Sequence, residues 1–368
     1  MLKDRAQKAL ALKLSISKRW LPQLEIEIEA ETRLAKSKHM LTDIDVLAVA
    51  PGAIAGSSRL IFDCKSGARE SAIGRAFWLY GVMRKSSAEH GFIILNEKVK
   101  ITHDHRISAS DFGVSLVHEN ELDDLAQCLG GTTDVQDALT GDIDTWNKFL
   151  AIGGKYPATK EYLDFSRSRF WMIKDAGERC RKTVAKLRSI KSELDPSKAE
   201  HLAIFGDALC LFLLTISEMA SRLYLILVRP SSREEFSASL LALLYGGYEN
   251  LEAAQKIRRI TAGDNGPVDS ISIFPEIEKF EQLIREVLQA PNQVHVASLL
   301  AREMAFTALA ATGVSKLQEQ LATEASYATK FVLLASEYLA MATRLPNEFK
   351  EYYSQSSLNL SMGALGRK

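Results

Sequence analysis

In the first third of the chain, segments with the hydrophobic period of a strand alternate with segments that have the period of a helix. In residues 23–34, Leu24, Ile26 and Ile28 alternate with glutamates, and this period of two predicts a half-buried strand with an acidic outer face. Further strands are expected at 42–50, 59–65, 91–95 and 114–119, and helices at 4–20, 68–90, 106–113 and 120–127. The order α-β-β-β-α-β-α-β predicts an α/β unit in which helices flank a mixed sheet.

Beyond residue 130 nearly every segment has the spacing of a helix. Residues 130–142 form the expected linker, so the predicted domains are 1–129, an α/β domain, and 143–368, a larger all-α domain. Helices are expected at 144–152, 158–193, 197–228, 232–259, 272–289, 295–311, 313–324 and 326–344. The last residues are small and polar and are expected to be loose.

Composition narrows the class of protein. The formal net charge of the 368 residues is +0, so any contact with nucleic acid must come from local basic patches. The four cysteines form no CxxC pair, which argues against structural zinc and a disulfide framework and favours a reducing cytoplasm. Three charged residues interrupt the apolar segment 203–228, which predicts a buried helix rather than a membrane span. The N-terminus does not resemble a signal peptide.

Two acids and a lysine lie on neighbouring predicted strands. Asp63 and Lys65 are two positions apart and therefore share a face, whereas Cys64 should point to the opposite one. If the strands at 42–50 and 59–65 pair antiparallel, Asp45 comes to lie beside Asp63. Asp43 is an alternative to Asp45 as the acid that lies beside Asp63, but Asp43 is nearer the start of the strand. The plainer interpretation of Asp63 and Lys65 is an ion pair at the edge of a sheet.

This combination of residue types suits metal-assisted chemistry. Two carboxylates and several waters are the ligands that Mg²⁺ prefers. A bound metal lowers the pKa of its water and binds a phosphate oxygen, while a lysine can orient or deprotonate the attacking water and offset the growing negative charge. We therefore predict a metal site at Asp45 and Asp63, with Lys65 as the third catalytic residue.

One part of the chain resembles the PD-(D/E)XK, or restriction-endonuclease-like, nuclease superfamily: TDIDVLA is followed by a loop, a strand that ends in D-x-K, a helix and a further strand. The segment RISASDFGVSLVHENEL resembles the Mrr and archaeal-resolvase members of that superfamily. The resemblance covers about residues 1–127. It implies hydrolysis of phosphodiester bonds with Mg²⁺, for which Mn²⁺ could substitute, by a DNA endonuclease of restriction, anti-phage defence or repair. Members often add an acid from the first helix, and Asp4 is available for that role. The alternative is an inactive nuclease-like scaffold that binds nucleic acid or a partner protein.

Basic residues provide candidate contacts to nucleic acid, DNA rather than RNA. The candidates are Arg69 and Arg75 after the lysine, and Arg167, Arg169, Lys174 and Arg181 in the helical part. The second group could equally be a solvated helix face. The HDHR segment at 103–106 is expected in a surface loop. The helical domain is expected to bind substrate, sense a trigger, form a homodimer or hold a partner protein.

Overall fold

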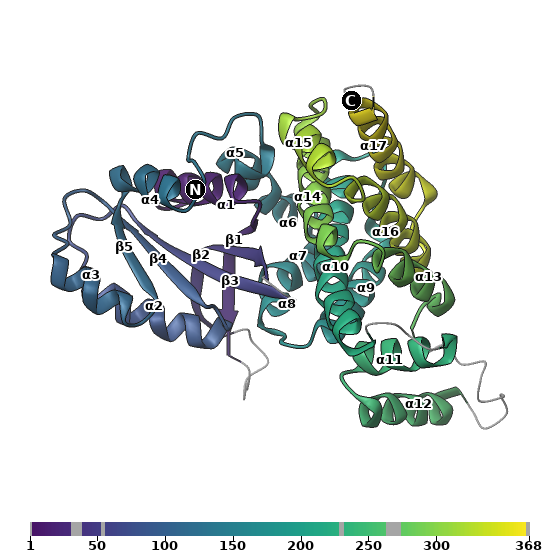
Figure 1. Ribbon diagram of the computed structural model, residues 1–368. Coiled ribbons are helices and arrows are strands. Elements are labelled where there is room, and N and C mark those ends of the chain that lie inside the picture. Colours follow the sequence, from purple (N-terminus) through teal and green to yellow (C-terminus); the bar gives the residue numbers. More distant parts are fainter. Residues whose placement is uncertain (1, 31–38, 53–55, 228–231, 263–273, 366–368) are drawn as a thin grey trace.

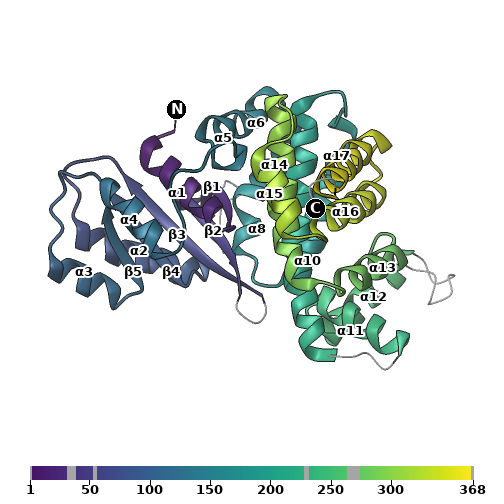
Figure 2. The same ribbon diagram turned by 45° about the horizontal axis from the view of Figure 1, so that its top comes forward.

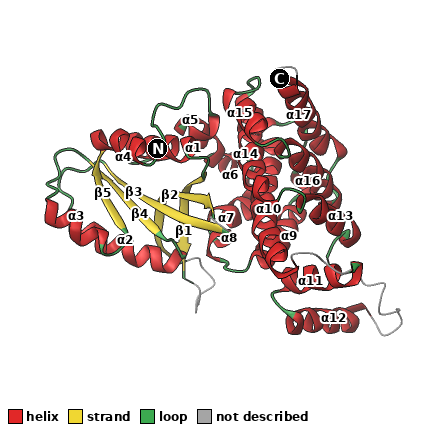
Figure 3. Cartoon of the chain, viewed as in Figure 1, coloured by secondary structure: helices red, strands yellow, loops and turns green. Residues whose placement is uncertain are grey.

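The computed structural model describes the chain except residues 1, 31–38, 53–55, 228–231, 263–273 and 366–368. An N-terminal mixed sheet with flanking helices is followed by a mostly helical C-terminal part, as Figures 1 and 3 show. The predicted fold class is therefore confirmed.

The sheet has five strands in sequential order. They are β1 (Leu21–Glu29), β2 (Met40–Pro51), β3 (Ser57–Lys65), β4 (His90–Leu95) and β5 (Val114–His118). The pairs β1–β2 and β2–β3 are antiparallel, whereas β3–β4 and β4–β5 are parallel. Val46 pairs with Phe62, and Phe62 in turn pairs with Phe92 and stacks on its ring. The sheet is therefore a meander that continues into two crossover strands.

Four helices belong to the N-terminal part: α1 (Arg5–Ser17), α2 (Ala72–Ser86), α3 (His103–Ser110) and α4 (Leu122–Cys128). Helix α1 contacts β1, β2 and β3, and α2 contacts β4 and β5. The expected loop at 103–106 is wrong, because Thr102 caps a helix there. The Thr102 hydroxyl accepts a bond from the His105 amide at 3.1 Å, and His105 Nδ1 accepts one from the Thr102 amide at 3.4 Å.

The helices of the C-terminal part are α5 (Ile143–Leu150), α6 (Ile152–Lys155), α7 (Lys160–Arg167), α8 (Arg169–Met172), α9 (Ala176–Ser189), α10 (Ala199–Leu227), α11 (Arg233–Tyr245), α12 (Tyr248–Ala262), α13 (Ile277–Val287), α14 (Val294–Ala310), α15 (Lys316–Glu324), α16 (Ala328–Thr343) and α17 (Asn347–Leu365).

Two of the expected long helices are interrupted. The chain leaves helical geometry at Ser168, and the Asp175 side chain caps a new helix by accepting from the Glu178 amide at 2.7 Å. The second interruption lies at Gly246 and Gly247, which have φ values of 74° and 127°. Glycine adopts this left-handed geometry without a Cβ clash, so α11 ends there and α12 begins.

The expectation of a loose C-terminus is wrong for residues 354–365, which belong to α17 (Asn347–Leu365), and residues 366–368 lie outside the described part of the chain. Phe349 and Tyr353 are fully buried, and the Tyr353 hydroxyl donates to the Leu202 carbonyl at 2.8 Å. Gly206 makes room for this ring, because a Cβ there would lie 2.0 Å from the Tyr353 oxygen. Two buried aromatic side chains thus anchor a segment that is rich in small polar residues.

Helix α10 is the core of the helical part, and Figure 2 shows it running beside α14. It is long and apolar enough to cross a membrane by length and composition, but 89% of that apolar window is buried within the protein. This burial is typical of the central helix of a soluble protein and confirms the predicted buried helix.

The segment 130–142 is packed onto both parts of the chain. It ends in a 3-10 turn, η2 (Leu139–Gly141), that contacts α1 and α14. The buried Glu303 carboxylate accepts bonds from the amides of Leu139 and Thr140, both at 2.8 Å. A side chain of the helical part therefore holds the expected linker in place.

Candidate active site at the end of strand β3

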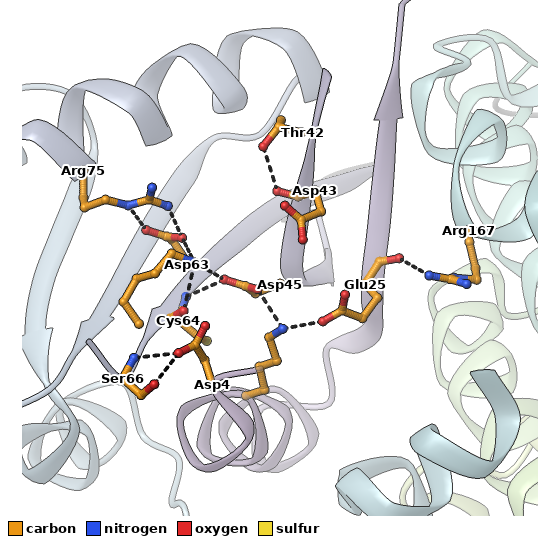
Figure 4. Close-up of polar contacts among 12 residues, drawn as sticks. Asp4, Glu25, Thr42, Asp43, Asp45, Asp63, Cys64, Ser66, Arg75 and Arg167 are labelled. Atoms are coloured by element: carbon orange, nitrogen blue, oxygen red, sulfur yellow. Dashed lines mark hydrogen bonds and ion pairs between the residues drawn. The ribbon is translucent and has the colours of Figure 1, made fainter. Parts of the chain in front are cut away.

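The two predicted acids, Asp45 and Asp63, lie close together, as Figure 4 shows, and Lys65 pairs with both of them. The β2–β3 register pairs Val46 with Phe62, so one further step places Asp45 opposite Asp63. Lys65 Nζ lies 3.1 Å from Asp45 Oδ2 and 3.0 Å from Asp63 Oδ1. One ammonium group therefore bridges two buried carboxylates.

Arg75 on α2 binds the outer acid of this group. Its Nε donates to Asp63 Oδ2 at 2.7 Å, and its Nη2 donates to Asp63 Oδ1. The guanidinium also lies over the Trp78 ring, 4.0 Å from its centroid. The structure thus gives Arg75 a protein partner, Asp63, that the sequence analysis did not predict. Arg69, its companion in the prediction, is exposed in the segment between β3 and α2.

The inner acid is held by Lys8, a residue that the sequence reasoning missed. Lys8 Nζ lies 2.9 Å from Asp45 Oδ1 and also donates to Glu25 on β1. The lysine side chain is only 3% exposed. One signal in the sequence was available, because Asp4 and Lys8 are four residues apart and therefore share a face of the first helix.

Glu25 was also missed, because strict alternation assigned it to the solvated face together with Glu27 and Glu29. Its φ is 55°, a left-handed conformation that is rare for a residue with a side chain in a strand. The β1–β2 register places Glu25 opposite Asp45. The strained backbone at this position therefore coincides with the row of charged side chains, as such strain often does at functional sites.

These contacts form one row of alternating charges, here called the charge ladder. It consists of Glu25, Lys8, Asp45, Lys65, Asp63 and Arg75, in that order. Because it contains three acidic and three basic side chains, the charge ladder has a formal net charge of zero. The Cys64 amide donates to Asp45 Oδ2 at 2.8 Å, while the Cys64 side chain is fully buried. Backbone and side chains thus fix the position of Asp45 together.

Asp4 lies beside the ladder without joining it. Asp4 Oδ1 accepts bonds from the Ser66 amide at 2.7 Å and from the Ser66 hydroxyl at 2.6 Å. Desolvation raises the pKa of Asp4, but the Ser66 hydrogen bonds outweigh it and leave the pKa below its ordinary value. Asp4 is therefore an ionised carboxylate next to Lys65, and its hydrogen bonds hold the segment that follows β3.

Burial and pairing shift the pKa values of the ladder in opposite senses. Desolvation raises the pKa of Asp63, although Arg75 and Lys65 oppose the shift. Desolvation alone would lower the pKa of Lys65, but the carboxylates of Asp63 and Asp45 raise it above its ordinary value. Lys65 is therefore protonated at neutral pH. In this arrangement it is therefore suited to stabilise negative charge, and the predicted role in deprotonating the water is disfavoured.

Asp45 and Asp63 provide as many carboxylates as a protein commonly supplies to a hard divalent cation such as Mg²⁺. Mg²⁺ is commonly held by one or two carboxylates, while waters and substrate phosphates complete its shell. Asp45 and Asp63 already enclose one cationic group, the Lys65 ammonium. Over the described part of the chain, no group of three or more His, Cys, Asp or Glu side chains could hold a metal. The donor set therefore fits a metal that binds together with a phosphate substrate.

The remaining predicted residues are spread over the molecule. Asp43 is exposed, unlike Asp45. Arg167 lies near the ladder: its Nη2 donates to the Glu25 carbonyl at 3.4 Å and lies 3.5 Å from Glu27 Oε1. Arg181 instead bonds the Leu244 carbonyl on α11. Arg169 and Lys174 are exposed. The predicted basic residues therefore do not form one stripe, and of the four in the helical part only Arg167 is placed at the site.

No protein-family profile, curated protein or solved structure matches the chain.

Proposed function

We propose that the chain is a Mg²⁺-dependent nuclease that hydrolyses phosphodiester bonds in nucleic acid, DNA rather than RNA, as an endonuclease of restriction, anti-phage defence or repair in the cytoplasm. One observation carries the proposal. Asp45 and Asp63, from adjacent strands, bind the same cationic group at 3.1 and 3.0 Å. A mere edge ion pair would need only one of these acids.

Each member of the site has a distinct role in this proposal. Asp45 and Asp63 hold Mg²⁺ or Mn²⁺, which when bound supplies a water of lowered pKa and binds a phosphate oxygen. Lys65 carries a positive charge toward the phosphate and offsets the charge that develops on it. Its side chain is 23% exposed, whereas that of Asp63 is 1% exposed, so the lysine is the member that faces the substrate.

A cleavage assay on supercoiled DNA with Mg²⁺ tests the proposal. Asp63→Asn and Lys65→Met should each lower the rate at least about a hundredfold, as loss of a metal ligand or of a charge-stabilising group does. Lys186→Gln on α9 is the matched control, because Lys186 only pairs with the exposed Glu161. Thermal melting would show that each variant is folded. Equal Mg²⁺-dependent rates in the wild type and both site variants would refute the nuclease.

The second candidate, an inactive scaffold, is favoured by a different observation. Arg75 already binds both oxygens of Asp63, so a metal must compete with a guanidinium. Titration with Mn²⁺ separates the two candidates. The nuclease predicts binding that Asp45→Asn weakens and Arg75→Gln strengthens. The scaffold predicts no binding to the wild type or to Arg75→Gln, together with lower stability of Arg75→Gln.

We propose that the helical part contributes substrate contacts, a trigger site, a homodimer contact or a partner surface. The support for a substrate contact is Arg167, which lies next to Glu25 at the end of the charge ladder. Arg167→Gln should weaken DNA binding in a filter-binding assay, whereas Arg181→Gln should not, because Arg181 faces α11.

A further inference from the structure

A second basic site lies at the other end of β3, between the sheet and the helical part. It is a cavity of about 230 Å³. Strand β3 supplies Ser57 and Arg59, and α9 supplies Arg179. Hydrogen bonds join the two sides: Arg59 Nη1 donates to the Trp171 carbonyl at 2.5 Å, and the Ser57 hydroxyl donates to Glu218 at 2.8 Å. The cavity is therefore part of the junction between the two regions.

The lining has an excess of positive charge. Four basic residues and one acid line the cavity: Arg59, Lys85, Lys174, Arg179 and Glu218. The single carboxylate is already shared, because Glu218 Oε1 accepts from Ser57 and Oε2 accepts from Arg179. The lining therefore carries more basic groups than acidic ones, and Arg59, which is partly buried, is one of them.

This excess of positive charge affects the pKa of Arg59. Burial and the nearby Arg179 guanidinium lower the pKa of Arg59 to about 10, and Glu218 offsets only part of the shift. Both hydrogen bonds of the Arg59 side chain leave from Nη1 and end on carbonyls, those of Ser86 and Trp171. Neither of these acceptors carries a charge. Two guanidinium groups held close enough to repel each other favour an anion between them.

Arg179 provides an independent observation. Its side chain is 2% exposed, and its Nε has no hydrogen-bond partner although it is buried. An unsatisfied buried donor on a charged group is costly, and such donors are rare in folded proteins. Arg179 thus brings to the cavity lining a guanidinium whose hydrogen-bonding capacity is not fully used.

We propose that this cavity binds a phosphate group that bridges Arg59 of the sheet and Arg179 of the helical part. Guanidinium groups match the oxygens of phosphate in paired hydrogen bonds. The volume lies below the range of about 300–1,000 Å³ typical of pockets for whole drug-sized ligands, so the cavity suits a small anion such as phosphate. The exposed Lys174 marks the side from which the group enters.

The site is separate from the charge ladder. Arg59 and Asp63 are four residues apart on one strand, roughly 13 Å at the rise of a β-strand. This proposal therefore does not depend on the proposed nuclease function. It can be tested in EDTA, which removes any bound divalent metal. A phosphate bound here would tie β3 to α9 and so connect the two regions.

Two sources share this chemistry: free phosphate, and the terminal phosphate of an oligonucleotide. Thermal unfolding of the full chain in EDTA tests the first, with inorganic phosphate compared against chloride at equal ionic strength. We expect saturable stabilisation by phosphate alone. Arg59→Gln should weaken it about tenfold, the value of one lost charge-assisted contact. Lys174→Gln should weaken it by a smaller factor, and it keeps the test valid if Arg59→Gln unfolds.

The control and the second arm complete the test. Arg169→Gln removes an exposed arginine from the adjoining segment and should leave phosphate binding unchanged. A short single strand with a 5′-phosphate, compared with its 5′-hydroxyl form, tests the second source by fluorescence anisotropy. Stabilisation or binding that requires both the phosphate and Arg59 in either arm supports the site. If neither arm shows it, or if Arg59→Gln and Lys174→Gln respond as the wild type does, the proposal is wrong.

Discussion

Acids and bases are paired in both parts of the molecule, but the pairs differ in their access to solvent. In the N-terminal part, the charge ladder includes the buried Lys8 and the partly exposed Lys65 and Arg75, and Asp45 and Asp63 each have two basic partners. In the helical part, Arg302 and Asp207 form a pair at 2.9 Å in which both side chains are 0% exposed.

The difference shows how the same residue types can serve two purposes. Around Asp207 the partners are fixed: the Tyr162 hydroxyl donates to it at 2.7 Å, and Arg302 donates to Gln23 of β1 at 3.1 Å. Solvent cannot replace a lost partner there. In the ladder, by contrast, Lys65 can leave one acid while Lys8 or Arg75 remains. The ladder therefore consists of shared, partly exposed partners, whereas the enclosed pair serves packing and position.

Removal of Arg302 should have the largest effect on stability. Arg302→Met leaves the Asp207 carboxylate buried with only Tyr162 as its donor, and we expect a loss of about 3–5 kcal/mol. Urea unfolding measures the loss. The double variant Arg302→Met/Asp207→Leu should recover most of it, because it removes both charges. A loss below about 1 kcal/mol in the single variant would show that water reaches this pair.

Low pH should weaken the contact between the two regions next most strongly. His295 on α14 lies 3.2 Å from the Arg19 carbonyl, and burial lowers its pKa from 6.5 to about 4. Because the folded pKa is the lower one, the unfolded chain binds more protons between these values. The contribution of His295 to stability is therefore complete above pH 6.5 and is lost as the pH falls toward 4, by roughly 3 kcal/mol.

His295→Gln isolates this contribution, because glutamine keeps a donor for the Arg19 carbonyl but does not titrate. The difference in unfolding free energy between the wild type and this variant should shrink as the pH falls from 7 to 4. A difference that stays constant over this range would contradict the buried, neutral imidazole.

Loss of Lys8 should cost less than loss of Arg302, although both side chains are buried. Lys8→Met leaves Asp45 with Lys65 and the Cys64 amide, so the acid stays partly satisfied. We expect a loss of about 1–3 kcal/mol in urea unfolding. A loss as large as that of Arg302→Met would mean that the ladder is as rigid as the enclosed pair.

Lys186→Gln should have the smallest effect. Lys186 and Glu161 form a pair at 2.6 Å whose side chains are 36% and 56% exposed. Solvent screens such a pair, so we expect a change within about 0.5 kcal/mol. High salt should change the stability of the wild type no more than that of the variant if the pair is as weak as its exposure indicates.

Local patterns in the sequence were enough for the sheet and for part of the site. The alternation at 23–34 and the D-x-K spacing identify strands β1 and β3, and a hairpin between 42–50 and 59–65 brings Asp45 to Asp63. These are statements about residues near each other in the chain or on adjacent strands. For the same reason, the breaks at Gly246 and Gly247 were visible in principle, since paired glycines weaken a helix.

The sequence by itself determined the order of the elements, the buried α10 and the meeting of Asp45, Asp63 and Lys65, because period and spacing act along the chain. Only the tertiary structure decided which other groups join them. Lys8 arrives through the docking of α1, Arg75 through the docking of α2, and Glu25 through a left-handed residue within β1. It also decided that α17 is ordered, because Tyr353 finds a cavity beside Gly206, nearly 150 residues earlier in the chain. Contacts between distant segments depend on how whole elements pack, which no local pattern encodes.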